Sequence, residues 1–280
     1  MPVLSTFGAM SARGFGFRTA VPFELTITSS QQELNLNTYL TSEGWNGSDN
    51  VIVTIDSGVY IWSDDTSVGG LTIPSSLNGK VTIINYGYII GRGGDAGGND
   101  GGPALVNNAT GVTLTNASGA YIAGGGGGGG NSVSGGGAGG GNAISIYGTR
   151  YGGAIGQAGQ VGNGGGNAYH GGSGGNYYDA GSGTTVYPIG SGGGRILSSV
   201  GADGGGVCNT GPFGYGGGAG GVGNNAGSKG CTTQGTGGGG GWGAAGGTGH
   251  NSAGGAGGAA ISGTAIATFT NNGTVYGSTA

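Results

Sequence analysis

Few side chains in this chain of 280 residues have the types and spacing that catalysis or metal binding requires. Two histidines, His170 and His250, are too few for a zinc site built on imidazole ligands. Asp64 and Asp65 are adjacent, so on a strand their carboxylates would point to opposite faces instead of converging as an acid–base pair. We find neither a nucleophile elbow in its strand–turn–helix context nor a phosphate-binding GxxxxGK[ST] motif. We therefore expect no enzyme activity, no cofactor and no metal.

Aromatic side chains gather instead in the segments that join the glycine-rich stretches after residue 123. Such side chains can stack on sugars or fill protein interfaces, and a few charged residues accompany them. The residues that we predict to contact a receptor are Tyr147, Arg150, Tyr151, Tyr169, His170, Tyr177, Tyr178, Tyr187, Phe213 and Tyr215. The alternative for any one tyrosine is that its ring covers an outer glycine segment. Cys208 and Cys231 form either a disulfide or two buried thiols.

Glycine dominates the second part of the chain, since 72 of the 82 glycines follow residue 90. Disorder is the common outcome of such a composition, but it normally accompanies high net charge and few aromatic residues. Here the net charge is −4, and there are 13 tyrosines. Ordered glycine needs nearly complete backbone hydrogen bonding, because glycine loses the most conformational entropy on folding. Packed polyglycine-II helices meet this need. The sequence therefore predicts a sandwich of such helices, with residues 124–130 as a rigid central segment.

Residues 23–90 have a different pattern, in which apolar and polar residues alternate over short segments separated by turns. Strands are predicted at 24–28, 50–55, 59–62, 71–73, 80–85 and 88–90, with one helix over 34–45 that ends near Gly44. This spacing predicts a small β-module, either a sandwich or a solenoid. A strand–turn–strand unit at 81–91 recurs at 112–122 and 267–277. The three copies could stack as one layer, which the C-terminal copy would close.

These patterns predict three domains: an arm at 1–22, the β-module at 23–90 and a glycine-rich domain at 91–280. The fold class is mainly β with a polyglycine-II sandwich, in which a C-terminal strand closes the glycine lattice. The arm contains no acidic residue, and its aromatic and basic side chains predict docking on another protein, with packing on its own domain as the alternative. The residues assigned to this attachment are Phe7, Arg13, Phe15, Phe17 and Arg18.

Charge and hydropathy exclude several partners. The chain has no basic patch of the kind that binds nucleic acid. It has no run of 18 apolar residues, so we expect no membrane insertion. The N-terminal residues MPVL lack the charged and apolar regions of a signal peptide.

Three segments of the chain resemble the tail-fibre tip adhesins of T-even-like bacteriophages. They are residues 88–94 (YIIGRGG), residues 120–130 (AYIA followed by seven glycines), and residues 259–277, which begin AAISG and end TVYG. The resemblance covers residues 80–280, and residues 24–94 are similar to the β-module that precedes glycine tracts in other phage tail proteins. It implies a non-enzymatic adhesin whose variable loops, held by a polyglycine-II sandwich, contact a host outer-membrane protein or surface glycan. Residues 1–22 do not match the T-even type of attachment domain.

Our leading hypothesis is a phage tail-fibre tip adhesin that is part of the virion and is made in the host cytoplasm. It would dock on another tail or fibre protein through residues 1–22 and bind the host through its loops. One alternative is a structural tail component that caps or joins other virion proteins without host contact. A remote alternative is an ice-binding protein, because packed polyglycine-II helices also occur in a glycine-rich antifreeze family.

Overall fold

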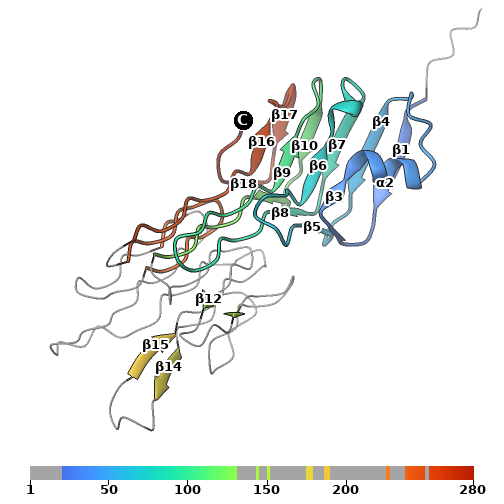
Figure 1. The fold of residues 1–280 in the computed structure, drawn as a ribbon. Coiled ribbons are helices and arrows are strands. Elements are labelled where there is room, and N and C mark those ends of the chain that lie inside the picture. The colour runs from blue at the N-terminus through green and yellow to red at the C-terminus, as the bar shows by residue number, and fades with distance from the viewer. Residues whose placement is uncertain are drawn as a thin grey trace, which may run out of the picture.

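Three parallel β-sheets form the main body of the molecule, which is a computed structural model (Figure 1). The structure describes residues 21–130, 143–144, 150–151, 175–178, 186–189, 225–227, 237–249 and 252–280. The chain passes through the three sheets in turn, so that β1, β2 and β3 form one coil, β4, β5 and β6 the next, and β7, β8 and β9 the third. This order defines a parallel β-solenoid, the second of the two architectures predicted for the β-module.

Each sheet contains the strands that lie on the same side of successive coils. The first sheet has the order β1 (Phe23–Ile27), β4 (Val51–Ile55), β7 (Val81–Asn85), β10 (Thr113–Asn116) and β17 (Thr268–Asn271). The second has the order β2 (Gln31–Gln32), β5 (Tyr60–Trp62), β8 (Tyr88–Ile90), β11 (Tyr121–Ala123) and β18 (Thr274–Tyr276). The third has the order β3 (Leu34–Asn35), β6 (Leu71–Ile73), β9 (Leu105–Asn107) and β16 (Ile261–Gly263). A bridge between Ile261 and Thr279 completes the third side of the fifth coil.

Alternating burial explains why these segments form the walls of the solenoid. In β4 and β7 every second side chain is buried, as the period of a strand with one face on a core requires. Val53, Ile83 and Leu114 are partners in register on successive coils and belong to one hydrophobic cluster. Burial of each such side chain stabilises the fold by about 1.5–3 kcal/mol.

The helix α2 (Leu36–Ser42) packs against β3 and β6. The side chain of Asn35 caps it by accepting a hydrogen bond from the backbone N–H of Thr38 at 3.2 Å. Leu36 and Leu40 are buried on its inner face, and Gly44 follows the helix with a φ of +94°. The helix predicted over 34–45 is therefore confirmed, although its first two residues form β3. A short 3-10 turn, η1 (Ser75–Leu77), precedes β7.

The repeated unit predicted at 81–91, 112–122 and 267–277 is confirmed by the stacking of β7, β10 and β17. Asn116 lies in register between Asn85 and Asn271. Asn85 Nδ2 donates a hydrogen bond to Asn116 Oδ1 at 2.9 Å, and Asn116 Nδ2 donates to Asn271 Oδ1, also at 2.9 Å. This ladder satisfies amides that would otherwise be costly at a buried corner.

Both glycine-rich segments leave the solenoid at the same corner. Residues 91–104 lie between β8 and β9, and residues 124–260 lie between β11 and β16. Because β8 and β11 are adjacent and parallel, the segments that continue them begin side by side. The glycine-rich segments are thus insertions into solenoid coils. The three sheets continue across residue 90, where we predicted a domain boundary.

Residues 124–130 form the centre of a hydrogen-bonded lattice, and all seven are buried. Their backbone groups bond to several other segments, which are 91–98, 99–102, 237–243, 244–247 and 255–258. Toward 91–98 the bonds recur at every third residue. The donors and acceptors are the N–H of Gly91 and the C=O of Ala123, the N–H of Gly94 and the C=O of Gly126, and the N–H of Gly97 and the C=O of Gly129.

The same period holds on another side of the central segment. There the carbonyl groups of Gly124, Gly127 and Gly130 accept from the N–H groups of Gly243, Gly240 and Gly237. Neighbouring backbones lie so close that a Cβ built on Gly127 would overlap the carbonyl group of Gly255. A Cβ on Gly124 would likewise overlap that of Gly258. The backbone of residues 255–259 therefore excludes a side chain at these two positions.

The first prediction concerns the lattice. We expect Gly127→Val to lower the free energy of unfolding by at least about 3 kcal/mol, because overpacking here displaces backbone and not a flexible side chain. Thermal unfolding followed by circular dichroism measures this. The matched control is Ala245→Val, at an exposed position of the neighbouring segment. Equal melting temperatures for the two variants would show that residues 124–130 are not enclosed.

The second prediction concerns the asparagine ladder. We expect Asn116→Leu to destabilise the protein by about 2–4 kcal/mol, since it removes three hydrogen bonds and leaves the Asn85 amide without its main acceptor. Denaturant unfolding provides the measurement, with the exposed Asn108→Leu as control. A loss as small as that of the control would mean that the ladder contributes no stability.

Candidate binding surfaces

Five of the ten residues predicted to contact a receptor lie in strands of which only the backbone is described. Arg150 and Tyr151 form β13 (Arg150–Tyr151), Tyr177 and Tyr178 belong to β14 (Gly175–Tyr178), and Tyr187 belongs to β15 (Val186–Ile189). The other five, Tyr147, Tyr169, His170, Phe213 and Tyr215, lie outside the described residues. The same is true of the attachment residues Phe7, Arg13, Phe15, Phe17 and Arg18, and of both cysteines.

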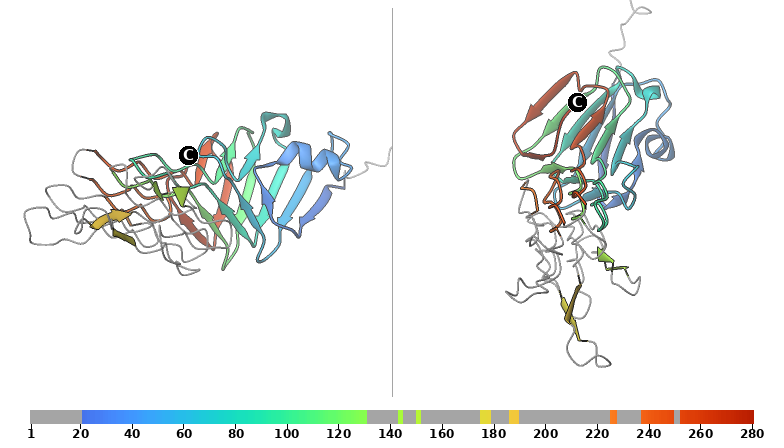
Figure 2. Two further views of the ribbon diagram at one scale, coloured as in Figure 1. Left: turned by 60° about the horizontal axis from the view of Figure 1, so that its bottom comes forward. Right: turned by 60° about the vertical axis from the view of Figure 1, so that its left-hand side comes forward.

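The described strands of this region form two antiparallel pairs. β12 (Ala143–Ile144) pairs with β13, and β14 pairs with β15. Tyr177 lies directly opposite Tyr187 in the second pair. Figures 1 and 2 show β14 and β15 at the end of the molecule opposite β1, beyond the described glycine segments. The structure thus brings these two predicted contact residues together at the far end.

A cluster of aromatic side chains lies where the glycine segments leave the solenoid. Tyr60, Tyr88 and Tyr121 are partners in register on the outer face of the second sheet. Their ring centroids are 5.0 Å apart between Tyr60 and Tyr88 and 4.6 Å apart between Tyr88 and Tyr121. Trp242, from a lattice segment, packs on Tyr121 with a centroid distance of 6.1 Å. The cluster therefore joins the lattice to the solenoid.

Exposure of this cluster changes from coil to coil. Tyr121 and Trp242 are 1% and 0% exposed, whereas Tyr60, Trp62 and Tyr88 are half-buried. Half-buried rings can pack on a sugar or on an apolar protein surface. This face is a described candidate contact surface, separate from the β14–β15 pair.

Sequence reasoning did not single out the aromatic cluster, although a signal for it was present. A Tyr-Ile pair occurs at Tyr60, Tyr88 and Tyr121, in each case as the first residues of a strand on the second side of a coil. Recognition of a coil period over these three positions would have predicted a tyrosine ladder.

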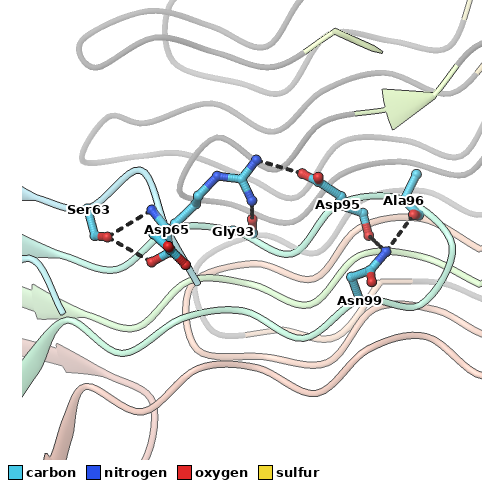
Figure 3. A network of polar contacts seen from close by, with 7 residues as sticks. Ser63, Asp65, Gly93, Asp95, Ala96 and Asn99 are labelled. Carbon is cyan, nitrogen blue, oxygen red and sulfur yellow. Dashed lines mark hydrogen bonds and ion pairs between the residues drawn. The ribbon is translucent and has the colours of Figure 1, made fainter. Parts of the chain in front are cut away.

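A polar network fixes the first turn of the lattice (Figure 3). Arg92 forms an ion pair with Asp95 at 2.8 Å and donates a second hydrogen bond to the carbonyl group of Gly93. Asn99 Nδ2 donates to the carbonyl groups of Asp95 and Ala96 at 3.3 and 2.9 Å. These contacts hold the turn in which the segment after β8 reverses direction.

Asp64 and Asp65 lie in the turn after β5, where both are exposed. The backbone N–H and the hydroxyl group of Ser67 donate to Asp65 Oδ1 and lower the pKa of that carboxyl group. Ser63 Oγ accepts from the backbone N–H of Asp65 at 3.0 Å. The two residues thus belong to a turn, in which the hydrogen bonds from Ser67 favour the charged form of the Asp65 carboxyl group.

Among the described residues, no three His, Cys, Asp or Glu side chains are grouped so that they could hold a metal ion. The part of the chain that the structure describes also contains no helix with the length and hydrophobicity needed to cross a membrane.

The buried phenol of Tyr121 leads to a prediction about how folding stability depends on pH. Burial, with smaller contributions from Tyr60, Tyr88 and Tyr276, raises its pKa well above the usual 10.0. Among the described residues, its hydroxyl group has no hydrogen-bond partner. The unfolded chain releases this proton first, so stability should fall above pH 10 by up to about 1.4 kcal/mol per pH unit.

We expect Tyr121→Phe to remove that part of the fall and to leave stability at pH 8 unchanged or higher. Denaturant unfolding at pH 8 and pH 11 measures both effects. The control is Tyr86→Phe, whose side chain is 48% exposed. If both variants lost stability equally between the two pH values, the buried phenol would not be the cause.

Three comparisons with known proteins gave one family match and one structural match. The family model of the phage tail fibre adhesin Gp38 matches residues 22–200. Among solved structures, the crystal structure of the gp37-gp38 adhesin tip complex of the bacteriophage S16 long tail fiber matches with a TM-score of 0.47 and 20% sequence identity, over 92% of this chain and 82% of that chain. No curated protein matches the chain significantly. Because the family model covers more than half of the sequence, the chain belongs to the phage tail fibre adhesin Gp38 family.

Proposed function

We propose that this tail fibre adhesin is the receptor-binding tip of its fibre and that loops at the far end of the glycine lattice contact the host surface. The observation that carries the proposal is the buried, hydrogen-bonded run 124–130, which follows β11 directly where the chain leaves the solenoid. A segment bonded to neighbours on several sides is a stiff support, since each displacement breaks several hydrogen bonds. Loops held by such a support keep fixed relative positions.

The lattice segments are, in this proposal, polyglycine-II helices packed as a sandwich. Backbone bonds that recur at every third residue fit a helix with three residues per turn. A β-strand would bond to one neighbour at every second residue. Glycine is needed because carbonyl groups of adjacent segments occupy the space of a Cβ at Gly124 and Gly127.

Aromatic side chains with little net charge would carry recognition. Tyr177 and Tyr187 lie opposite one another in the hairpin at the far end, and tyrosine gives a large contact area at low entropic cost. A host outer-membrane protein or a surface glycan is the proposed receptor class. The remaining predicted contact residues belong to the same proposal, as does attachment of residues 1–22 to another tail or fibre protein.

Recognition of this kind requires binding and no catalysis, so we propose a non-enzymatic protein. Its family places it in the virion tail, and its position at the fibre tip is part of the proposal. The alternative of a structural component that joins or caps other virion proteins predicts normal particles whose adhesin never touches the host.

The ice-binding alternative would require a regular face of small or hydroxyl side chains. On the outer face of the first sheet, Thr82, Thr113 and Thr268 are partners in register. Ile52 continues this row on the next coil, so the row of hydroxyl groups is interrupted. A thermal-hysteresis measurement tests this alternative directly.

The fourth prediction tests receptor binding. We expect the double variant Tyr177→Ala, Tyr187→Ala to bind host cells at least about 30-fold more weakly, since a hot spot contributes about 2 kcal/mol or more. Labelled purified protein and cell-sedimentation binding curves provide the measurement. Tyr86→Ala is the control, because it removes an exposed tyrosine from the solenoid.

A complementary experiment exchanges residues 142–151 and 167–189 for the corresponding loops of a relative with another host. We expect the host range to follow the loops. Unchanged adsorption to the original host after both exchanges, with the double tyrosine variant binding normally, would contradict the adhesin proposal and favour the structural alternative.

A further inference from the structure

The outermost described coil of the solenoid, within residues 261–280, has an edge at β17 that pairs with no other described strand. β17 and β18 are the outermost strands of the first and second sheets, and Figure 1 shows β17 at the margin of its sheet. All four residues of β17 are exposed. Natural proteins usually protect such an edge with charged side chains or proline. Residues 261–280 contain neither.

The backbone of β17 presents hydrogen-bonding groups on its open side. In a parallel sheet, alternate residues of a strand turn their N–H and C=O groups to opposite neighbours. The N–H groups of Thr268 and Asn272 donate to the carbonyl groups of Val112 and Asn116, at 3.3 and 2.8 Å, toward β10. The N–H and C=O groups of Phe269 and Asn271 therefore turn away from β10.

An apolar side chain also lies at this edge. Phe269 is the partner in register of Leu114, which is fully buried. Phe269 itself is 36% exposed. It occupies an inward position of the solenoid, and its exposure follows from its place in β17, the outermost described strand of the sheet. A further strand would bury this ring as β17 buries Leu114.

In the asparagine ladder, each Nδ2 donates to the next coil, and the last asparagine, Asn271, lies at the open edge of β17. Asn271 accepts from Asn116 through Oδ1, and its Nδ2 donates to no described residue. In the two preceding steps of the ladder, the acceptor for Nδ2 is a side-chain oxygen of the next coil. A strand added to β17 would complete the pattern with an oxygen at that position.

We propose that the edge of β17 is a docking site for one β-strand of another tail protein, running parallel to β17. The docked strand would carry an apolar residue against Phe269 and, two residues later, an Asn, Asp, Ser or Thr whose side-chain oxygen accepts from Asn271. Backbone bonds to Phe269 and Asn271 would provide affinity, and these two side chains would provide register. The site is distinct from the attachment predicted for residues 1–22.

A second copy of this chain fits the site less well. Stacked head to tail, its β1 would continue the sheet and place Ile27 opposite Asn271, as Ile27 lies opposite Ile55 at the other end. The Asn271 amide would then lose water without gaining an acceptor, which is costly. Head-to-tail stacking also produces open filaments instead of a closed assembly. The partner's origin in the tail rests on the proposed function, whereas the chemistry of the docked strand does not.

The fifth prediction tests this site with two variants. Asn271→Asp keeps the oxygen that accepts from Asn116, but it replaces the free donor with a charged acceptor. Phe269→Glu places a charge where the proposed strand would bring an apolar side chain. We expect purified phage particles that carry either variant gene to contain at least about tenfold fewer copies of the adhesin than wild-type particles, a loss of about 1.4 kcal/mol in docking. Immunoblots of the particles measure this.

Asn272→Asp is the matched control, because it adds the same charge at a neighbouring exposed residue whose N–H already bonds to β10. Phage particles with the Asn272→Asp variant should carry wild-type amounts of the adhesin. Melting temperatures and host-cell binding of the free proteins report folding and receptor recognition separately from docking. A variant that binds cells normally as free protein but is missing from particles has lost docking, and one that is present on particles but does not adsorb has lost receptor binding.

Hydrogen–deuterium exchange provides a second measurement on the wild-type protein. The amides of Phe269 and Asn271 should exchange freely in the isolated protein and slowly in assembled particles. Wild-type amounts of both variants on particles, or equally fast exchange of these amides after assembly, would overturn the proposal. A purified wild-type dimer that Phe269→Glu converts to a monomer would overturn it in favour of a second copy of this chain.

Discussion

Backbone hydrogen bonding between segments without side chains is the constraint on which the glycine-rich region depends. The groups of residues 124–130 find partners on several neighbouring segments, and the bonds toward 91–98 recur at every third residue. This arrangement requires that backbones approach to distances at which no Cβ fits, as at Gly127. Ordering so much glycine is entropically expensive. The lattice can therefore form only where many bonds form together, which requires a template.

The solenoid provides that template. β8 and β11 are adjacent, parallel and paired in register, and both continue into glycine at the same corner. The bond from Gly91 to the carbonyl group of Ala123 continues the pairing of these strands directly into the lattice. Trp242 packs on Tyr121 beside this corner. The first segments of the lattice thus inherit their spacing and register from strands whose positions hydrophobic burial has already determined.

Two separate parts of the molecule have different chemistry. At the far end of the molecule, the pairing of β14 with β15 brings Tyr177 and Tyr187 together. At the end of the solenoid, β17 presents an uncharged edge with Phe269 and Asn271. A stiff support allows contacts at the two places to act separately, because a loop can change without altering the coils. For the receptor-binding role proposed above, such separation would let the recognition loops change while the body stays the same.

Local patterns in the sequence determined much of this protein. The alternation in β4 and β7, the helix that ends before Gly44 and the recurrence of an asparagine after three similar strands were all readable, because each depends on neighbours in the chain. Glycine content and low charge also indicated ordered packing in place of disorder. Tertiary structure alone decided that the glycine region is an insertion into a coil. It also decided that Tyr60, Tyr88 and Tyr121 form one stack, and that residues beyond 260 return to complete the sheets that begin near residue 23. These features join residues far apart in the chain, and local periodicity contains no information about which distant backbones will share hydrogen bonds.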